Sequence, residues 1–288
     1  MIKNKTILIT GGAGFVGSHL CEFLIKRNRV YVLDNYFTGS RKNHINGVLY
    51  KKGETKNAFK LFKNLNSLDY IFHLGEYSRV EQSFNDIEKV MEYNVGSFFE
   101  IIKLTMHFNS KLIYCGSSTK FAVYEKNDHH SPYAWSKKNN TEFLINFANY
   151  YKIKYAITYF YNVYGEREIE EGKYATVIAK FLKLKNEKAK YIEITRPGTQ
   201  KRNFTHVKDI ISGLITVAEK GNGDGYGISS LKAYSIIQLS RLFNMDYKLL
   251  PKKKGNRLKG KVNISKTKKL GWSPKYDLQK YLKKRIKN

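Results

Sequence analysis

The sequence predicts an α/β fold built on a doubly wound parallel sheet. Three observations lead to this prediction. Strand-like and helix-like segments alternate over roughly the first 165 residues, a glycine-rich turn joins the first strand to the first helix, and the second strand ends in an acidic residue. Alternating strands and helices are typical of βαβ units, whose strands pair in parallel and whose helices cover both faces of the sheet.

The individual elements follow one another in a regular order. Apolar runs rich in β-branched and aromatic residues predict strands near residues 6–10, 30–34, 48–50, 69–74, 111–115 and 154–160. Apolar residues at helical spacing predict helices near residues 14–27, 57–66, 86–108, 132–151 and 174–185. After Gly165 the pattern loosens into shorter elements, with no internal repeat and no low-complexity linker.

Length and cysteine content limit the class of protein. A chain of 288 residues forms one or two domains and can bury a large core. Its two cysteines exclude a disulfide framework, since Cys115 falls in a predicted strand and Cys21 in the first helix, and a reducing cytoplasm is the expected location. There is no signal peptide and no long uncharged apolar stretch, so we expect no membrane association.

The net charge of +28 is unusually high. Lysines are spread along the whole chain, and no basic run is interleaved with aromatic residues in the manner of an RNA-binding module. We therefore expect a lysine-rich solvated surface and no specific nucleic-acid partner. Such a surface attracts anionic small molecules and binds nucleic acid non-specifically at low salt.

The glycine-rich turn predicts a dinucleotide site. Gly11, Gly14 and Gly17 directly follow the first predicted strand, with Phe15 and Val16 between the last two glycines at the start of the helical pattern. Glycines let the backbone turn tightly and approach a pyrophosphate, which the positive end of the helix favours. Asp34 closes the second strand 23 residues after Gly11, where a carboxylate can accept from a ribose 2′-hydroxyl.

Tyr133 and Lys137 predict acid–base chemistry. Four residues apart in a helical segment, their side chains lie on one helix face. A phenol is a poor base at neutral pH, and a nearby ammonium favours its ionised form. The spacing alone is weak evidence in a chain with 22 tyrosines, and an exposed helix pair would show it too. The dinucleotide turn is what makes a catalytic pair the better interpretation.

Together these features resemble the extended short-chain dehydrogenases/reductases, in particular the NAD-dependent nucleotide-sugar epimerases and dehydratases of the UDP-glucose 4-epimerase type. The resemblance covers roughly residues 5–280. Beyond the two motifs above it rests on Leu33–Asn35 with Thr38–Gly39, Ile71–Leu74, Asn94, Ser117–Ser118, Tyr159–Gly165, Gln200–Asp209 and Gly271–Pro274. The family's arginine at the start of its R-x-x-N-V-Y-G segment is replaced by Tyr159.

The resemblance implies a Rossmann-type NAD-binding domain over residues 1–165, to which a segment near 205–220 returns. It implies a smaller C-terminal substrate-binding domain over residues 166–288. NAD is the implied cofactor, with Gly11, Gly14, Phe15, Val16, Gly17, Asp34, Asn35, Leu74 and Lys137 as its binding residues. The implied catalytic residues are Ser118, which binds the reacting oxygen, Tyr133, which takes the hydroxyl proton, and Lys137, which binds the nicotinamide ribose.

The same resemblance implies a nucleotide-diphosphate sugar as substrate. Its expected binding residues are Glu76, Arg79, Thr119, Asn162, Arg202 and Arg257. Arginines suit the diphosphate because the geometry of a guanidinium matches that of phosphate oxygens. The assignment of Arg257 rests on a loosely matched segment, and Arg257 could equally be an ordinary surface arginine. Glu76 departs from the family, which has a small residue there, so its role stays open. No metal site is expected.

The resemblance favours a 4-epimerase that works through a transient 4-keto intermediate. The alternatives are a 4,6-dehydratase, a 4-keto reductase, and a non-catalytic NAD-binding protein. Dehydratases of the family carry an Asp-Glu pair after the active-site Thr, whereas Ser118 is followed here by Thr119 and Lys120. Family members pair their equivalents of helices 86–108 and 132–151, so a homodimer is expected.

Overall fold

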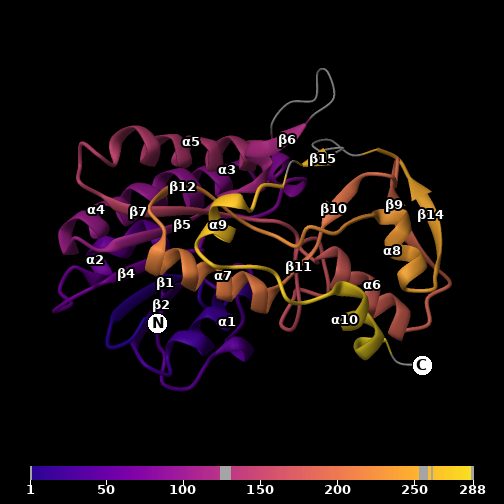
Figure 1. The fold of residues 1–288 in the computed structure, drawn as a ribbon, viewed down its shortest axis with the longest axis horizontal. Helices are drawn as coiled ribbons and strands as arrows, with labels where there is room; N and C mark the ends of the chain where they lie inside the picture. Colours follow the sequence, from indigo (N-terminus) through magenta and orange to yellow (C-terminus); the bar gives the residue numbers. More distant parts are fainter. Residues whose placement is uncertain (1, 124–130, 253–258, 261, 287–288) are drawn as a thin grey trace.

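A seven-stranded parallel sheet forms the centre of the larger part of the molecule (Figure 1). The structure is a computed structural model that describes residues 2–123, 131–252, 259–260 and 262–286. The strand order is β12-β7-β5-β4-β1-β2-β3, and every pairing is parallel. The strands are β1 (Thr6–Thr10), β2 (Arg29–Asp34), β3 (Leu49–Lys52), β4 (Tyr70–His73), β5 (Lys111–Ser117), β7 (Lys154–Phe160) and β12 (Gly223–Ile228). The predicted doubly wound α/β fold is confirmed.

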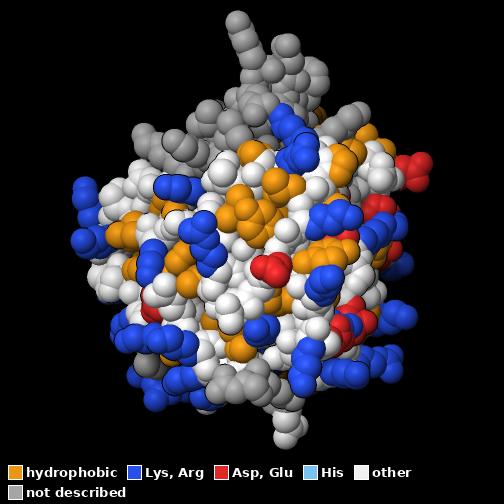
Figure 2. All heavy atoms as spheres, turned by 90° about the vertical axis from the view of Figure 1, so that its right-hand side faces the viewer, with side chains coloured by type: hydrophobic (Ala, Val, Ile, Leu, Met, Phe, Trp, Pro, Cys, Tyr) orange, Lys and Arg blue, Asp and Glu red, His pale blue; other side chains and the backbone are white. Residues whose placement is uncertain are grey.

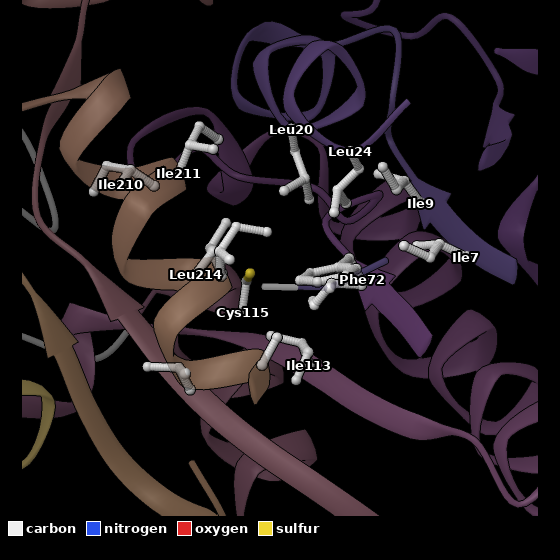
Figure 3. Packing of buried hydrophobic residues seen from close by; sticks show 14 of the residues in the cluster. Ile7, Ile9, Leu20, Leu24, Phe72, Ile113, Cys115, Ile210, Ile211 and Leu214 are labelled. Atoms are coloured by element: carbon white, nitrogen blue, oxygen red, sulfur yellow. The ribbon is translucent and has the colours of Figure 1, made fainter. Parts of the chain in front are cut away.

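Helices cover both faces of this sheet. On one face lie α1 (Phe15–Leu24) and α7 (Val207–Lys220), and on the other lie α2 (Ala58–Phe62), α4 (Ser97–Phe108) and α5 (Pro132–Phe147). Alternate residues of β1 supply the two cores, because successive strand side chains point to opposite faces. Ile7 and Ile9 belong to one buried cluster with Leu20 of α1 and Leu214 of α7, and Phe72 lies at its centre (Figure 3), whereas Leu8 belongs to the cluster on the other face.

One predicted helix is divided in the structure. The segment expected as a single helix over residues 86–108 consists of α3 (Ile87–Val90), a π-helical stretch at Met91–Gly96, and α4. The π stretch holds Asn94, which is buried and donates through Nδ2 to Ser136 Oγ of α5 at 2.9 Å. Stretches of π-helix inside α-helices are frequent at functional sites.

The remaining elements form a second, smaller core (Figure 1, right). It is built from α6 (Val177–Asn186), β9 (Tyr191–Thr195), α8 (Ile236–Leu242) and α10 (Leu278–Arg285), and β14 (Asp246–Leu250) pairs with β9. Further strands form short pairs: β8 (Val163–Tyr164) with β11 (Thr205–His206), β10 (Lys201–Asn203) with β13 (Ala233–Ser235), and β6 (Ala122–Val123) with β15 (Lys259–Gly260). The helix α9 (Ser265–Lys269) packs beside β12.

The surface carries the charge that the composition implies. Lys and Arg side chains are spread around the face of the smaller part, with acidic and apolar side chains between them (Figure 2). Within the described residues, no helix is long and apolar enough to cross a membrane.

Candidate active site

A cavity of about 480 Å³ opens at the carboxyl ends of the central strands, which is where ligands bind in open α/β sheets. Most of the residues singled out in the sequence line it: Gly11, Gly14, Phe15, Val16, Gly17, Asp34, Asn35, Leu74, Glu76, Arg79, Ser118, Thr119, Tyr133, Lys137 and Asn162. Arg202 lies on β10 and is not among the residues that line it, although its neighbour Phe204 is. Arg257 lies outside the described residues.

The glycine turn forms one end of the cavity. Gly11 has φ +72°, a backbone conformation that favours glycine, and Gly14 is the N-cap of α1. A Cβ at Gly17 would lie 2.1 Å from the Gly11 carbonyl oxygen, so the helix can approach the turn only without a side chain there. The N-terminus of α1 consequently faces the cavity, and its free N–H groups fit an anionic pyrophosphate.

Asp34 lies at the same end and is 6% exposed. Its two carboxylate oxygens accept from the backbone N–H groups of Ala13 at 2.9 Å and Tyr36 at 2.8 Å. Burial raises the pKa of this carboxyl, and the two N–H bonds oppose that effect. Each carboxylate oxygen can accept more than one hydrogen bond, so Asp34 retains capacity for a ribose hydroxyl.

The helix α5 brings the acid–base pair to the other end of the cavity. Ser131 caps α5 by accepting from the Ala134 N–H at 3.2 Å, and Pro132 occupies the first turn. Tyr133 and Lys137 therefore follow one turn apart, and both line the cavity. Tyr133 is available to a ligand, whereas the Lys137 side chain is only 7% exposed.

Hydroxyl groups at the end of β5 face the same space. Ser118 and Thr119 line the cavity. The Thr119 hydroxyl donates to Ser117 Oγ at 2.8 Å, and its backbone N–H lies 3.2 Å from the same oxygen. Ser117 thus fixes the turn that presents the two hydroxyl-bearing residues after it.

Glu76 occupies an unexpected place beneath Lys137. Its side chain is 2% exposed and forms an ion pair with the Lys137 ammonium. Two further groups donate to the same carboxylate: Asn140 Nδ2 at 3.0 Å and the Tyr114 hydroxyl at 3.3 Å. Burial raises the pKa of the Glu76 carboxyl, and Lys137 offsets part of that effect. Burial is the largest single influence on Lys137 and lowers its pKa, but Glu76, with smaller contributions from Tyr133 and Cys115, more than offsets it, so that the pKa lies above its ordinary value.

Arg79 and Asn162 use part of their hydrogen-bonding capacity within the protein. The Arg79 guanidinium donates to the Tyr174 carbonyl, from Nε at 3.0 Å and from Nη2 at 2.6 Å. Asn162, between β7 and β8, has φ +29°, and its amide donates to the Asn203 carbonyl at 3.1 Å. The amide oxygen of Asn162 is the group that it can offer to a ligand.

An aromatic wall of the cavity was not predicted. Phe37 packs against Tyr77, Tyr93 and Tyr174, with ring centroids 5.2–6.0 Å apart, and Phe37, Tyr77 and Tyr93 line the cavity. Phe37 could have been found, since it stands between Asn35 and the Thr38–Gly39 match. No sequence signal distinguishes Tyr77 and Tyr93 from the other tyrosines.

No group of three or more His, Cys, Asp or Glu residues suited to a metal ion occurs in the part of the chain that the structure describes. The arrangement instead suits a dinucleotide that stretches from Asp34 past the glycine turn to Tyr133 and Lys137. The α1 N-terminus, the Asp34 carboxylate and the buried ammonium all fit such a group.

Comparison with known proteins defines the class. The model of the NAD-dependent epimerase/dehydratase family matches residues 7–229, and the chain belongs to this family. Its members act on nucleotide sugars with NAD as cofactor, and they include epimerases, dehydratases and decarboxylases.

Individual relatives cover nearly the whole chain but differ in activity. A putative UDP-glucose 4-epimerase of Methanocaldococcus jannaschii is 30% identical over 96% of both chains. UDP-glucuronic acid decarboxylase 3 of Arabidopsis thaliana is 27% identical over 97% of this chain and 87% of its own length. Among solved structures, UDP-N-acetylglucosamine 4-epimerase of Methanobrevibacter ruminantium, in complex with UDP-N-acetylmuramic acid, is 27% identical with a TM-score of 0.88, covering 99% of this chain and 98% of its own.

Proposed function

We propose that the protein is a nucleotide-sugar 4-epimerase that acts through a transient 4-keto sugar. The observation that carries the proposal is the single cavity that joins Ser118, Tyr133 and Lys137 to the dinucleotide turn. The 4-epimerases among its relatives support it. The test is incubation of the NAD-loaded protein with a panel of UDP-, GDP-, CDP- and dTDP-sugars, read by NMR.

The side chains have distinct roles in this proposal. NAD, when bound, supplies the oxidant that accepts and later returns the hydride at C4. Tyr133 takes the proton from the 4-hydroxyl and gives it back, Ser118 donates a hydrogen bond to the reacting oxygen, and Lys137 binds the nicotinamide ribose. We assign contacts with the sugar to Asn162 and Thr119, which line the cavity, and contacts with the diphosphate to Arg79 and Arg202.

The supply of carboxylates favours epimerisation over dehydration. Elimination of water across C5–C6 needs a base for the C5 proton and an acid for the departing hydroxyl. The acidic residues that line the cavity, over the described ranges, are Asp34 and Glu76. Asp34 lies at the glycine-turn end and Glu76 is engaged by Lys137, so neither suits the two roles. Glu125 and Asp128 lie outside the described residues.

The protein should prefer NAD to NADP. Asp34 accepts from a ribose 2′-hydroxyl but repels a 2′-phosphate, so we expect NADP to bind at least about tenfold more weakly. Calorimetric titration with each cofactor measures the ratio, and Asp34→Asn should narrow it. Equal or tighter NADP binding by the wild-type protein would show that the exposed Arg41 and Lys42 recognise the phosphate.

We propose a homodimer formed through α4 and α5. Phe99 and Met106 of α4 and Trp135 and Ile145 of α5 are 42–57% exposed, an unusual number of large apolar side chains for adjacent surface helices. Light scattering at micromolar concentration should give a dimer, and Trp135→Glu should give a monomer. Leu231→Glu, at a residue 67% exposed elsewhere on the surface, is the control that should remain dimeric. A monomeric wild-type protein would refute this interface.

We also propose that the protein works in the cytoplasm. Cys21 and Cys115 are both free and buried, as expected of thiols in a reducing compartment. Burial raises the pKa of the Cys115 thiol to about 12, so it stays protonated and unreactive.

A further inference from the structure

Glu76 is a buried carboxylate that the proposed chemistry does not use. It follows β4 and lies where β4, β5 and α5 meet at the base of the cavity. Its partners are the ammonium of Lys137, the amide of Asn140 and the hydroxyl of Tyr114. A buried charge persists only when it is paired and hydrogen-bonded, and Glu76 meets both conditions.

We propose that Glu76 is a positioning residue, which anchors the Lys137 ammonium and directs its remaining N–H toward the cofactor ribose. The inference deepens the proposed function and rests on the role of Lys137 given there. It replaces the sequence-based expectation that Glu76 contacts the sugar, because its oxygens are already engaged inside the protein.

The donors of Lys137 support this assignment. An ammonium has three N–H donors. Nζ donates one to Glu76 and one to the Cys115 carbonyl at 2.5 Å, and it lies 4.8 Å from the centroid of the Tyr114 ring. Within the described residues, these two hydrogen bonds leave one N–H of the ammonium for a ligand, and Lys137 lines the cavity. The two internal bonds therefore fix the direction of the third.

The anchor is itself held in place by a network that spans the sheet and α5. Asn140 donates to Glu76 and also to the Asn94 carbonyl, at 3.0 and 2.9 Å. On the other side, His73 Nε2 lies 3.6 Å from Glu76 Oε1, and His73 Nδ1 lies 2.7 Å from the Thr10 hydroxyl. Because these contacts fix the Glu76 carboxylate from both sides, its ion pair with Lys137 also fixes the position of the ammonium.

The charges around Lys137 give the inference a measurable consequence. The titratable groups that face it are Glu76 after β4, His73 on β4, Tyr114 and Cys115 on β5, and Tyr133 on α5. Burial, and to a smaller extent the positive charge of Lys137, lowers the pKa of His73 to about 3, so His73 is neutral at ordinary pH. Glu76 is thus the carboxylate that opposes the effect of burial on the pKa of Lys137. Without it, burial prevails and the ammonium loses its proton at a lower pH.

The test is the pH dependence of NAD affinity, measured by calorimetry without any sugar. In Glu76→Gln, the loss of NAD affinity at alkaline pH should begin at least about one pH unit lower than in the wild type. The reason is the lower pKa of Lys137, since each pH unit is a tenfold change in protonation of the ammonium. Asp69→Asn is the matched control. It removes one negative charge just before the opposite end of β4, where Asp69 accepts from the Thr6 N–H at 2.9 Å, and should leave the profile unchanged. An identical profile for Glu76→Gln and wild type would overturn the proposal.

A second variant covers the case in which Glu76→Gln does not fold. If an unpaired ammonium is the cause, the double variant Glu76→Gln/Lys137→Met should fold, because it removes both charges. If the double variant also fails to fold, Glu76 has a structural role independent of Lys137 and the proposal is wrong. Because the assay needs no sugar, failure of every nucleotide sugar to react would refute the 4-epimerase and leave this test intact.

Discussion

Tyr133→Phe should lose at least about 10²–10⁴-fold in turnover, the contribution of a positioned acid–base group. The substitution removes one oxygen from a side chain that lines the cavity one turn before Lys137. The ring remains, so the fold and the affinity for NAD should change little. The measurement is the rate of sugar conversion with NAD affinity determined in parallel.

Tyr150→Phe is the matched control for this substitution. Tyr150 is 81% exposed, and loss of its hydroxyl should leave the rate unchanged. Turnover close to wild type in Tyr133→Phe would mean that another group moves the proton. Loss of NAD binding together with turnover would mean that the Tyr133 hydroxyl holds the cofactor site together.

Glu168→Gln should stabilise the protein by up to about 3 kcal/mol above neutral pH, and hardly at all near pH 4.5. Burial raises the pKa of Glu168 from 4.5 to about 7, while hydrogen bonds from Thr176 and from the Gly165 N–H oppose the rise. Between these two values the folded chain keeps a proton that the unfolded chain has lost. The stability of the wild type therefore falls as pH rises through this range, whereas glutamine has no charge to bury.

Urea unfolding at about pH 5 and about pH 8 measures this difference. The amide of glutamine can still accept from the Gly165 N–H and donate to the Thr176 hydroxyl oxygen, so the packing is retained. Glu170→Gln removes the same charge from an exposed neighbour and should change stability little at either pH. Equal stability of Glu168→Gln and wild type at the higher pH would show that Glu168 is already solvated in the folded state.

Local patterns were enough to predict the fold and both ends of the cavity. The glycine spacing, the strand that ends in Asp34 and the Tyr133–Lys137 pair are each confined to one turn or one strand, so their geometry follows from the backbone they specify. The carboxyl ends of neighbouring parallel strands then bring these segments to one edge of the sheet. That is why most of the residues chosen from the sequence line the same cavity.

Contacts between distant segments could not be predicted in the same way. Glu76 and Lys137 are 61 residues apart, and Arg79 and Tyr174 are 95 apart. Glu76 and Arg79 were expected at the substrate because they follow a strand end. Both line the cavity, but they also bind protein partners, the Lys137 ammonium and the Tyr174 carbonyl. The π-helical stretch around Asn94 was missed for a related reason, since apolar spacing does not report a change in backbone hydrogen-bond period.

The measurement that tests the proposed 4-epimerase most directly is NMR of the sugar-nucleotide panel in D₂O. Epimerisation returns the same hydride to C4, so we expect a second 4-epimer with no deuterium at any carbon. Elimination of water or loss of a carboxyl group creates a carbanion at C5, which takes up deuterium from the solvent. A 4-keto-6-deoxy sugar with a new methyl signal, or a pentose formed from a uronic acid, would contradict the proposal.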